Sequence, residues 1–261
     1  MAAFYRSNEA YAHQQASHTI AYFKRLLAVM DAVLTGPNLH VLEVGAGAGA
    51  AMREFLATHT DVRAVAMELS SSSQRDGSPW RSPSFTPVTG TALQLPFRDR
   101  SLDAVIAFEV LEHVPDVALA LREMLRVVRR SGHIIIGLPN HASLWTPIED
   151  AFRRRDRRAF GVDSGRGTWR WFKRNAGLAW QKRFSKDAEF LYREPVLHAA
   201  AGGDADAVYY AAPIDLLRFF HRHAVFVTSS AQVRLGWAGR FLPVEFQGST
   251  VMAWRVTDTP G

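Results

Sequence analysis

The sequence predicts an α/β domain built around a mainly parallel sheet. Short apolar runs recur along the chain, and segments with helical spacing lie between them. The runs are "LHVLEV", "RAVAMEL", "LDAVIAF" and "HIIIGL", each about as long as one strand and typical of strands covered on both faces. A glycine-rich stretch directly follows the first run, as expected at the turn from a strand into a helix.

A helix is expected before the first strand, within residues 1–38, which we predict to form an N-terminal helical cap. Its apolar residues recur at steps of three and four: Ile20, Phe23, Leu27, Met30 and Leu34. Gly36 and Pro37 then end the pattern. In the segment "FYRSNEAYAHQQASH" before this helix, Tyr11 and His18 are candidate contacts to a ligand.

The clearest helix follows the third run, in "PDVALALREMLRVVRRSG". Its apolar stripe consists of Val117, Leu121, Met124, Leu125 and Val128. Asp116 is a suitable N-cap, and Gly132 is expected to end the helix.

Two stretches interrupt the alternation of strands and helices. The first, "SSSSQRDGSPWRSPSFTP", has no period and predicts a loop in place of most of the helix after the second strand. The second covers residues 142–208, after which helical spacing resumes at Pro213. "AVFVTSS" and "STVMAWRVT" are then expected to be closing strands. We therefore divide the chain into the cap, a ligand-binding core (39–141), an insertion (142–208) and a C-terminal completion of the sheet (209–261).

Composition places the chain among globular proteins, with 48% hydrophobic and 21% charged residues. There is no cysteine, which excludes disulfides, thiolate catalysis and cysteine-ligated zinc. The chain lacks a signal-peptide pattern and any apolar run of about 18 residues, so we expect a soluble, cytoplasmic protein. The net charge is +6, and residues 150–195 carry thirteen Lys and Arg against six Asp and Glu. The basic surplus therefore lies in the insertion.

The stretch "VLEVGAGAGA", residues 41–50, is the most informative turn in the sequence. Its alternating glycines permit positive φ and close approach of a ligand to the backbone, without identifying the ligand. A dinucleotide fingerprint can be placed on Gly45, Gly47 and Ala50, with Glu68 as the ribose acceptor. Glu43 favours another ligand, because a carboxylate near the loop repels a pyrophosphate and attracts an ammonium or sulfonium.

"VLEVGAGAG" resembles the first motif of the class I S-adenosylmethionine-dependent methyltransferases. "TGTALQLPFRDRSLDAVIAFEVLEHVPD" and "LREMLRVVRRSGHIIIGLPN" are similar to the next parts of that family, in order and in register from about residue 39 to 140. The resemblance implies a Rossmann-like, doubly wound sheet of seven mainly parallel strands with an antiparallel final strand. It also implies S-adenosyl-L-methionine as the cofactor.

By this resemblance, eleven residues contact the cofactor. They are Glu43, Gly45, Gly47 and Gly49 at the methionine moiety, Glu68 at both ribose hydroxyls, Leu69, Thr91, Ala92 and Leu93 at the adenine, and Phe108 and Glu109 near the methyl group. Thr91 departs from the family, which usually has an acid there. A threonine hydroxyl still accepts a hydrogen bond, though without charge.

Methyl transfer from a sulfonium depends first on holding the acceptor in line with the methyl carbon. His113, in "LEHVPD", is the candidate general base, and the alternative is a histidine that shapes the pocket or bonds the backbone. His141, His221 and His223 are weaker candidates. The sequence shows no convincing cluster of metal ligands, so no metal is expected.

The insertion mixes cations with aromatic residues: Trp169, Trp171, Phe172, Trp180, Phe184 and Phe190. It suits a lid over an apolar acceptor, a nucleic-acid surface, an amphipathic segment on anionic lipid, or a basic helix face whose aromatics pack on the core. We favour the lid and predict methylation of a small or lipid-like molecule at oxygen, with nitrogen and carbon left open as acceptor atoms. The alternatives are a nucleic-acid methyltransferase and a cofactor-binding protein without transfer activity. The oligomeric state is left open.

Overall fold

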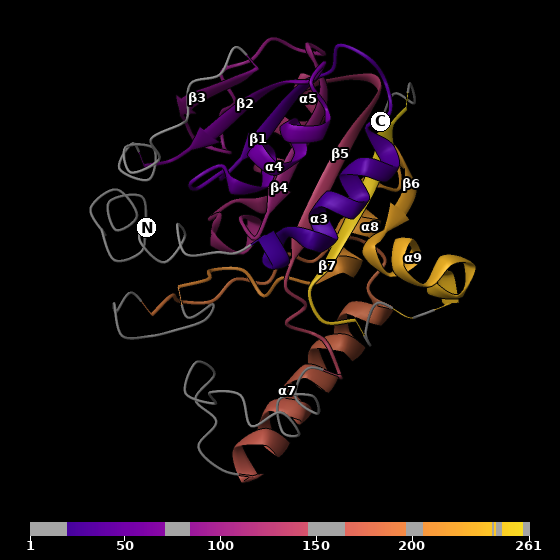
Figure 1. The fold of residues 1–261 in the computed structure, drawn as a ribbon. Helices are drawn as coiled ribbons and strands as arrows, with labels where there is room; N and C mark the ends of the chain where they lie inside the picture. Colours follow the sequence, from indigo (N-terminus) through magenta and orange to yellow (C-terminus); the bar gives the residue numbers. More distant parts are fainter. Residues whose placement is uncertain are drawn as a thin grey trace.

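The computed structural model describes residues 20–70, 84–145, 165–196, 206–241, 243 and 247–257. Seven strands form one sheet of order β3-β2-β1-β4-β5-β7-β6 in this part of the chain (Figure 1). They are β1 (His40–Val44), β2 (Arg63–Glu68), β3 (Phe85–Thr89), β4 (Leu102–Phe108), β5 (Val128–Leu138), β6 (Ala224–Ser229) and β7 (Thr250–Val256). Strands β1 to β5 run parallel, and β7 is antiparallel to both of its neighbours. The predicted Rossmann-like, doubly wound sheet with an antiparallel final strand is confirmed.

Helices cover both faces of the sheet. On one face lie α3 (Ile20–Val33), α4 (Ala50–Thr58) and α9 (Ser230–Leu235), and on the other α5 (Val117–Val127) and α8 (Pro213–Phe220). Two short 3-10 helices, η1 (Leu111–His113) and η3 (Gly236–Phe241), follow β4 and α9. The remaining helix, α7 (Gly165–Phe184), extends away from the sheet at the carboxyl ends of its parallel strands (Figure 1). None of the described helices combines the length and the apolar character needed to cross a bilayer.

Helix α5 begins as predicted, because the Asp116 carboxylate accepts a hydrogen bond from the Leu119 amide at 2.8 Å. Its predicted end at Gly132 is wrong. The helix ends at Val127, and β5 begins at once with Val128, which pairs with Leu102 of β4. Gly132 instead lies within β5, where a Cβ would come 2.6 Å from the Asp103 carbonyl oxygen.

The predicted loop after β2 is partly wrong. Residues 71–83 lie outside the described part of the chain, but residues 85–87 belong to β3. Strand β3 is the edge of the sheet and pairs with β2 alone, so Pro87 need not supply an N–H to a second neighbour.

The other predicted elements need smaller corrections. In α3 the predicted apolar stripe is wrong at Ile20, which is exposed; the buried residues of this helix are Leu26, Val29, Met30 and Val33. Helix α8 begins at Pro213, as expected for a residue without a backbone N–H. The two closing strands are β6 and β7, as predicted.

Candidate functional site

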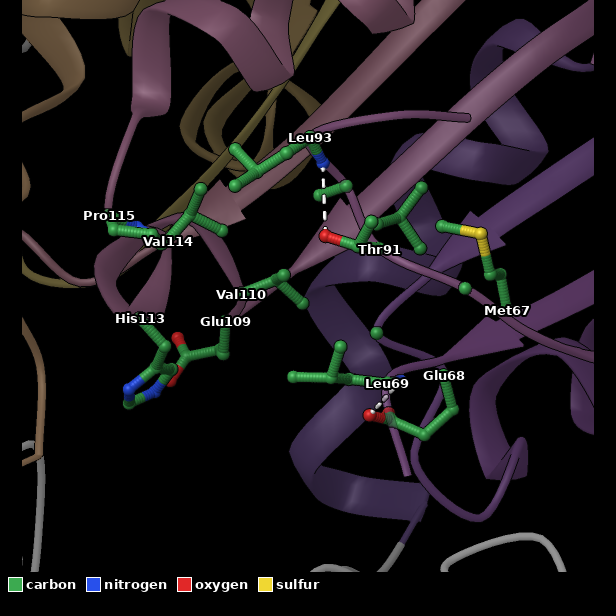
Figure 2. A pocket seen from close by; sticks show the side chains of 14 residues that line it. Met67, Glu68, Leu69, Thr91, Leu93, Glu109, Val110, His113, Val114 and Pro115 are labelled. Atoms are coloured by element: carbon green, nitrogen blue, oxygen red, sulfur yellow. Dashed lines mark hydrogen bonds between the residues drawn. The ribbon is translucent and has the colours of Figure 1, made fainter. Parts of the chain in front are cut away.

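A cavity of about 170 Å³ lies at the carboxyl ends of β1, β2 and β4. This is the point where strand order reverses, since β2 and β4 flank β1, and ligands of open α/β sheets bind at such points. Glu68 and Leu69 lie on one side of the cavity, Glu109 and His113 on the other (Figure 2). The predicted residues that line it are Gly45, Glu68, Leu69, Thr91, Ala92, Leu93, Glu109 and His113.

The three glycine amides of the loop donate their hydrogen bonds to groups of the protein itself. Gly45, Gly47 and Gly49 have φ angles of 67°, 50° and 64°, in the left-handed region that favours glycine. Their N–H groups donate to the Met67 carbonyl (2.8 Å), a Glu68 carboxylate oxygen (2.9 Å) and the Ala46 carbonyl (2.7 Å). A phosphate loop aims such amides at its anion. The internal bonding of all three therefore argues against the dinucleotide alternative.

Glu43 is buried in β1 directly before this loop and is only 5% exposed. Its Oε2 atom has no hydrogen-bond partner among the described residues. Burial, with a smaller contribution from the nearby Glu68 carboxylate, raises the pKa of Glu43 to about 8. An ionised carboxylate in this position is costly unless a cation or donor meets it. The site therefore favours a ligand that carries positive charge or N–H donors.

Glu68 ends β2, and its carboxylate closes onto neighbouring backbone. Oε2 accepts from the Gly47 amide, and Oε1 accepts from the Leu69 amide at 2.7 Å. Burial raises the pKa of Glu68, and these amide bonds oppose the rise. Each carboxylate oxygen can accept more than one hydrogen bond, so this position can still receive hydroxyl donors.

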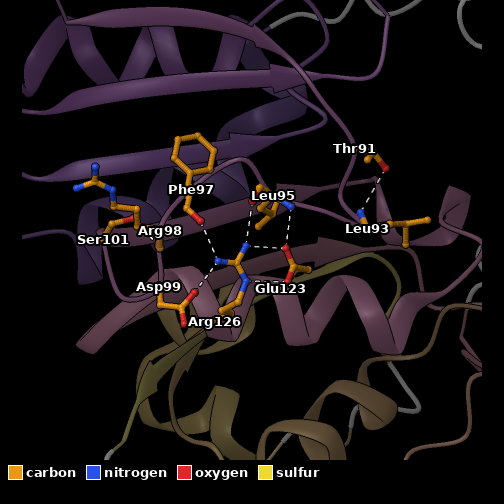
Figure 3. Close-up of polar contacts among 9 residues, drawn as sticks. All are labelled: Thr91, Leu93, Leu95, Phe97, Arg98, Asp99, Ser101, Glu123 and Arg126. Carbon is orange, nitrogen blue, oxygen red and sulfur yellow. Dashed lines mark hydrogen bonds and ion pairs between the residues drawn. The ribbon is translucent and has the colours of Figure 1, made fainter.

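The wall of the cavity that carries Thr91 is held by an arginine network (Figure 3). Thr91 Oγ1 accepts from the Leu93 amide at 3.3 Å. Arg126 of α5 donates to the carbonyls of Leu95 (2.9 Å) and Phe97 (2.8 Å). It also pairs with Glu123, whose pKa is lowered by this hydrogen bond. The segment that carries Thr91 is thus fixed to α5.

The side chains of Phe108, the last residue of β4, and Glu109, the next residue, take two different directions. Glu109 has a φ of 56°, an uncommon value for a side-chain-bearing residue, and its carboxylate accepts from the Tyr22 hydroxyl at 3.1 Å. The Phe108 ring is not part of the cavity lining. It packs against α3, with its centroid 5.4 Å from that of Tyr22 and 5.9 Å from that of Phe23.

His113 lies in η1, and its Nδ1 is 3.4 Å from a carboxylate oxygen of Asp206. Both side chains are partly buried. Sequence reasoning missed Asp206, because it lies near the end of the long insertion and belongs to no local motif. A carboxylate beside one ring nitrogen fixes the tautomer and orientation of a histidine.

The other candidate histidines lie outside the cavity lining. His141 Nδ1 accepts from the Ala211 amide at 3.0 Å, and His221 Nδ1 lies 2.8 Å from the Arg218 carbonyl oxygen. Tyr11 and His18 fall outside the described residues. Within the described part of the chain, no three His, Asp or Glu side chains gather in a group that could hold a metal ion.

The described part of the insertion is attached to the core by a buried polar network. Lys182 of α7 forms an ion pair with Asp215 of α8 and donates to the Glu189 carbonyl at 2.7 Å. The Tyr209 hydroxyl donates to Asp215 at 2.5 Å, and burial raises the pKa of Tyr209 well above its ordinary value. Sequence periodicity gave no sign of this network, since Lys182 looks like one more cation of a basic segment.

The aromatic residues of the insertion fall into two groups. Trp171 is buried, and Phe190 packs against Tyr209 with ring centroids 5.6 Å apart. Trp169, Trp180 and Phe184 are exposed. Packing on the core therefore accounts for only part of this aromatic content.

Comparison with known proteins gives the same family for the core. A family model described as a methyltransferase domain matches residues 42–136. The chain is similar to the demethylmenaquinone methyltransferase of Renibacterium salmoninarum, with 35% identity over 113 residues, 43% of this chain and 46% of that protein. It is 34% identical over 107 residues to a probable S-adenosylmethionine-dependent methyltransferase of Mycobacterium tuberculosis, 38% of this chain and 35% of that one. The matches thus span less than half of these relatives.

Solved structures match over most of the chain at low identity. Geranyl diphosphate C-methyltransferase from Streptomyces coelicolor, solved with S-adenosyl-L-homocysteine, gives a TM-score of 0.53 at 12% identity, over 95% of this chain and 84% of that one. The YcgJ protein of Bacillus subtilis gives 0.54 at 12% identity, over 91% and 99%. At such identities the likeness shows the fold alone.

Proposed function

We propose that the chain is a class I S-adenosylmethionine-dependent methyltransferase, the family that its core resembles, and that it methylates a small, lipid-like molecule at a hydroxyl oxygen. The observation that carries the proposal is the buried Glu43 carboxylate, whose Oε2 atom lacks a hydrogen-bond partner among the described residues. The neighbouring glycine loop has its amides bonded within the protein, so they are not aimed at an anion. Such a site suits the ammonium and sulfonium of S-adenosylmethionine and disfavours a pyrophosphate.

The described residues fit this cofactor part by part. Glu43 and the backbone of Gly45, Gly47 and Gly49 would hold the methionine moiety, because glycine lets a ligand approach the chain closely. Glu68 would accept the ribose hydroxyls. The adenine would lie between Leu69 and the Thr91 wall, with Ala92 and Leu93 supplying backbone groups. Glu109 would lie near the methyl group. Phe108 would not contact the cofactor; its ring, packed on α3, would help to position the next residue, Glu109.

When bound, S-adenosylmethionine supplies a methyl group on a sulfonium, and its transfer leaves a neutral thioether. The protein must place the acceptor oxygen in line with that methyl group and exclude water from the gap. His113 would take the hydroxyl proton at Nε2, since Nδ1 faces Asp206. Asp206 would stabilise the imidazolium that this proton transfer creates.

A lipid-like acceptor is supported by the lining of the cavity and by the relatives. Val44, Met67, Leu93, Val110 and Val114 make the lining mainly apolar. Several of the similar proteins are named demethylmenaquinone methyltransferases, and the substrate in that name is a lipid-like quinone. We accordingly propose a hydroxylated, largely apolar acceptor.

Titration calorimetry with S-adenosylmethionine tests the cofactor assignment. We expect the parent chain to bind and Glu68→Ala to weaken binding at least about tenfold, by loss of two charge-assisted hydrogen bonds. Glu54→Ala, an exposed glutamate of α4, is the matched control and should leave affinity unchanged. Absence of binding by the parent, or equal affinity of Glu68→Ala, would contradict the assignment.

Transfer is tested with cofactor carrying a labelled methyl group and a panel of hydroxylated apolar acceptors, with RNA as a separate arm. Label recovered in an apolar product supports the proposal. Label recovered in RNA would favour the nucleic-acid alternative, and tight cofactor binding without transfer to any acceptor would favour a protein that only binds the cofactor.

A further inference from the structure

Helix α7 exposes three large aromatic residues, and its buried side contains two polar residues beside Trp171 and Ala179, unlike the apolar stripe of an ordinary surface helix. Asn175 and Lys182 are each 1% exposed on its buried side. Trp169, Trp180 and Phe184 are 59%, 70% and 65% exposed. Such large exposed aromatic side chains on one helix indicate a surface that is covered during function.

The exposed residues form one stripe. Trp169, Lys173, Trp180 and Phe184 follow one another at steps of four, seven and four residues, which places them on one face of the helix. The Trp180 and Phe184 ring centroids are 4.5 Å apart, and Phe172 stacks on Trp169 at 5.6 Å. We call this stripe the aromatic face of α7.

Positive charge surrounds the aromatic face. Helix α7 contains six Lys and Arg and no Asp or Glu. Lys182 is neutralised by Asp215 inside the protein, whereas Arg170, Lys173 and Arg183 are exposed. A helix that combines exposed Trp and Phe with exposed cations is suited to the boundary between water and an anionic lipid surface, where rings enter the headgroup region and cations meet phosphates.

The helix is held in one orientation, as a docking surface requires. Besides the Lys182–Asp215 pair, the Asn175 side-chain amide donates to the Ser143 carbonyl at 2.8 Å, and Arg218 of α8 donates to the Arg183 carbonyl at 3.0 Å. Ser143 follows the carboxyl end of β5, the same edge of the sheet that carries the cavity. Figure 1 shows α7 extending from this edge.

We propose that α7 docks the protein on an anionic membrane surface through its aromatic face and exposed cations. Because α7 is bonded to the segment that follows β5, at the same end of the sheet as the cavity, docking would hold that end near the bilayer. Single-stranded nucleic acid is less well suited, because base stacking needs an open ring face. Phe172 already stacks on Trp169, and Lys173 Nζ lies over the same ring, 5.4 Å from its centroid.

Vesicle flotation with the full chain tests this proposal without a methyl acceptor or turnover. Anionic vesicles of phosphatidylcholine with about 30% phosphatidylglycerol are compared with neutral vesicles of phosphatidylcholine alone. We expect binding to the anionic vesicles that weakens with added salt, and at least about tenfold weaker binding to the neutral ones.

Matched double variants locate the surface. Trp180→Ser with Phe184→Ser should lower anionic-vesicle binding at least about tenfold. The control is Trp237→Ser with Phe241→Ser in η3, a pair as exposed (77% and 74%) and also in ring contact. Lys173→Glu with Arg183→Glu should lower binding similarly, whereas Arg63→Glu with Arg122→Glu, the same charge change at exposed sites on β2 and α5, should not.

Three results would overturn the proposal. The first is absence of flotation by the parent chain, and the second is equal flotation by the α7 variants and their controls. The third is a parent chain that binds a single-stranded RNA oligonucleotide but not vesicles, together with α7 variants that lose the RNA binding. Unchanged melting temperature and unchanged S-adenosylmethionine affinity in all variants would show that they remain folded. Failure here would leave the proposed function intact.

Discussion

Two of the buried carboxylates in the described part of the chain, Glu43 beside the glycine loop and Asp215 at the junction of α7 and α8, have different surroundings. Asp215 receives an ion pair from Lys182, a hydroxyl from Tyr209 and an amide from Glu189. Glu43 has an Oε2 atom without a partner among the described residues and a second carboxylate, Glu68, nearby. Removing one partner from a fully partnered buried charge leaves the other uncompensated and costs stability, whereas a buried carboxylate with an incomplete set of partners can still receive a ligand.

The largest expected effect is on the Asp215 side of the comparison. Asp215→Asn should lower the free energy of unfolding by about 3–5 kcal/mol, because it leaves the Lys182 ammonium buried without its counter-charge. Asp99→Asn, which removes an exposed partner of Arg126, should cost less than about 1 kcal/mol. Urea denaturation measures both.

Cofactor titration completes this test of Asp215. Affinity for S-adenosylmethionine should be unchanged in Asp215→Asn, provided that the variant is folded under the conditions used. Should it be too unstable to measure, Lys182→Met with Asp215→Asn removes the isolated charge and is expected to recover stability. A cost in Asp215→Asn no larger than that in Asp99→Asn would remove the distinction between the two carboxylates.

Glu43→Gln should act in the opposite direction on stability. The folded-state pKa of about 8 lies above the ordinary value of 4.5, so the folded chain binds more protons between these two pH values. Stability of the parent should therefore fall as pH rises from about 5 to 8, and Glu43→Gln should remove this slope, adding up to about 3 kcal/mol at pH 7.

The same variant should weaken binding of the cationic cofactor. In the parent, affinity should increase with pH up to about 8, because the ligand stabilises the ionised carboxylate and binding releases a proton. Calorimetry in two buffers of different ionisation enthalpy measures that proton. A flat pH profile in the parent would show that Glu43 stays neutral in the complex.

A pair of glycines sharpens the contrast between the loop and α7. Gly45→Ala combines a positive φ with a Cβ only 2.2 Å from Val110. It should lower the free energy of unfolding by about 2–3 kcal/mol and should also weaken cofactor binding. At Gly177 in α7 no atom lies within 4 Å of an added Cβ, so Gly177→Ala should add about 0.5–1 kcal/mol. Thermal and urea unfolding would show the opposite signs.

The smallest expected effect concerns the acceptor side of the cavity. Asp206→Asn should lower kcat about tenfold, since an amide orients His113 less well and does not stabilise its imidazolium. KM for the cofactor and the melting temperature should stay the same. A drop in melting temperature with unchanged kcat would instead make the His113–Asp206 pair a structural contact.

Local rules predicted the elements whose burial follows hydrophobicity. Helix α5 shows this well, because its capping Asp116 and its apolar stripe both belong to one short segment. The strands before and after it were equally predictable, since each is a short apolar run. The end of α5 was not, because pairing of Val128 with β4 overrides the glycine signal four residues later.

The site was predictable where a motif carried it and not where the chain returns from afar. Among the residues that the resemblance names, Glu68, Thr91 and Glu109 line the cavity. Four others do not: Glu43, Gly47, Gly49 and Phe108. Asp206 contacts His113 from near the end of the insertion, far along the chain, and no local pattern marks it. The buried face of α7 could not be predicted from hydrophobic periodicity, because it includes Asn175 and Lys182, whose partners lie in other segments of the chain.

The hydrogen bond between Tyr22 and Glu109 joins the N-terminal helix to the cavity rim. Linkage between two equilibria is reciprocal, so a ligand that stabilises this position of Glu109 also stabilises the docking of α3 on the sheet, and a docked α3 tightens the ligand by the same factor. The first turns of α3 are then a reporter of occupancy, and their amide hydrogen exchange should slow when the cavity is filled.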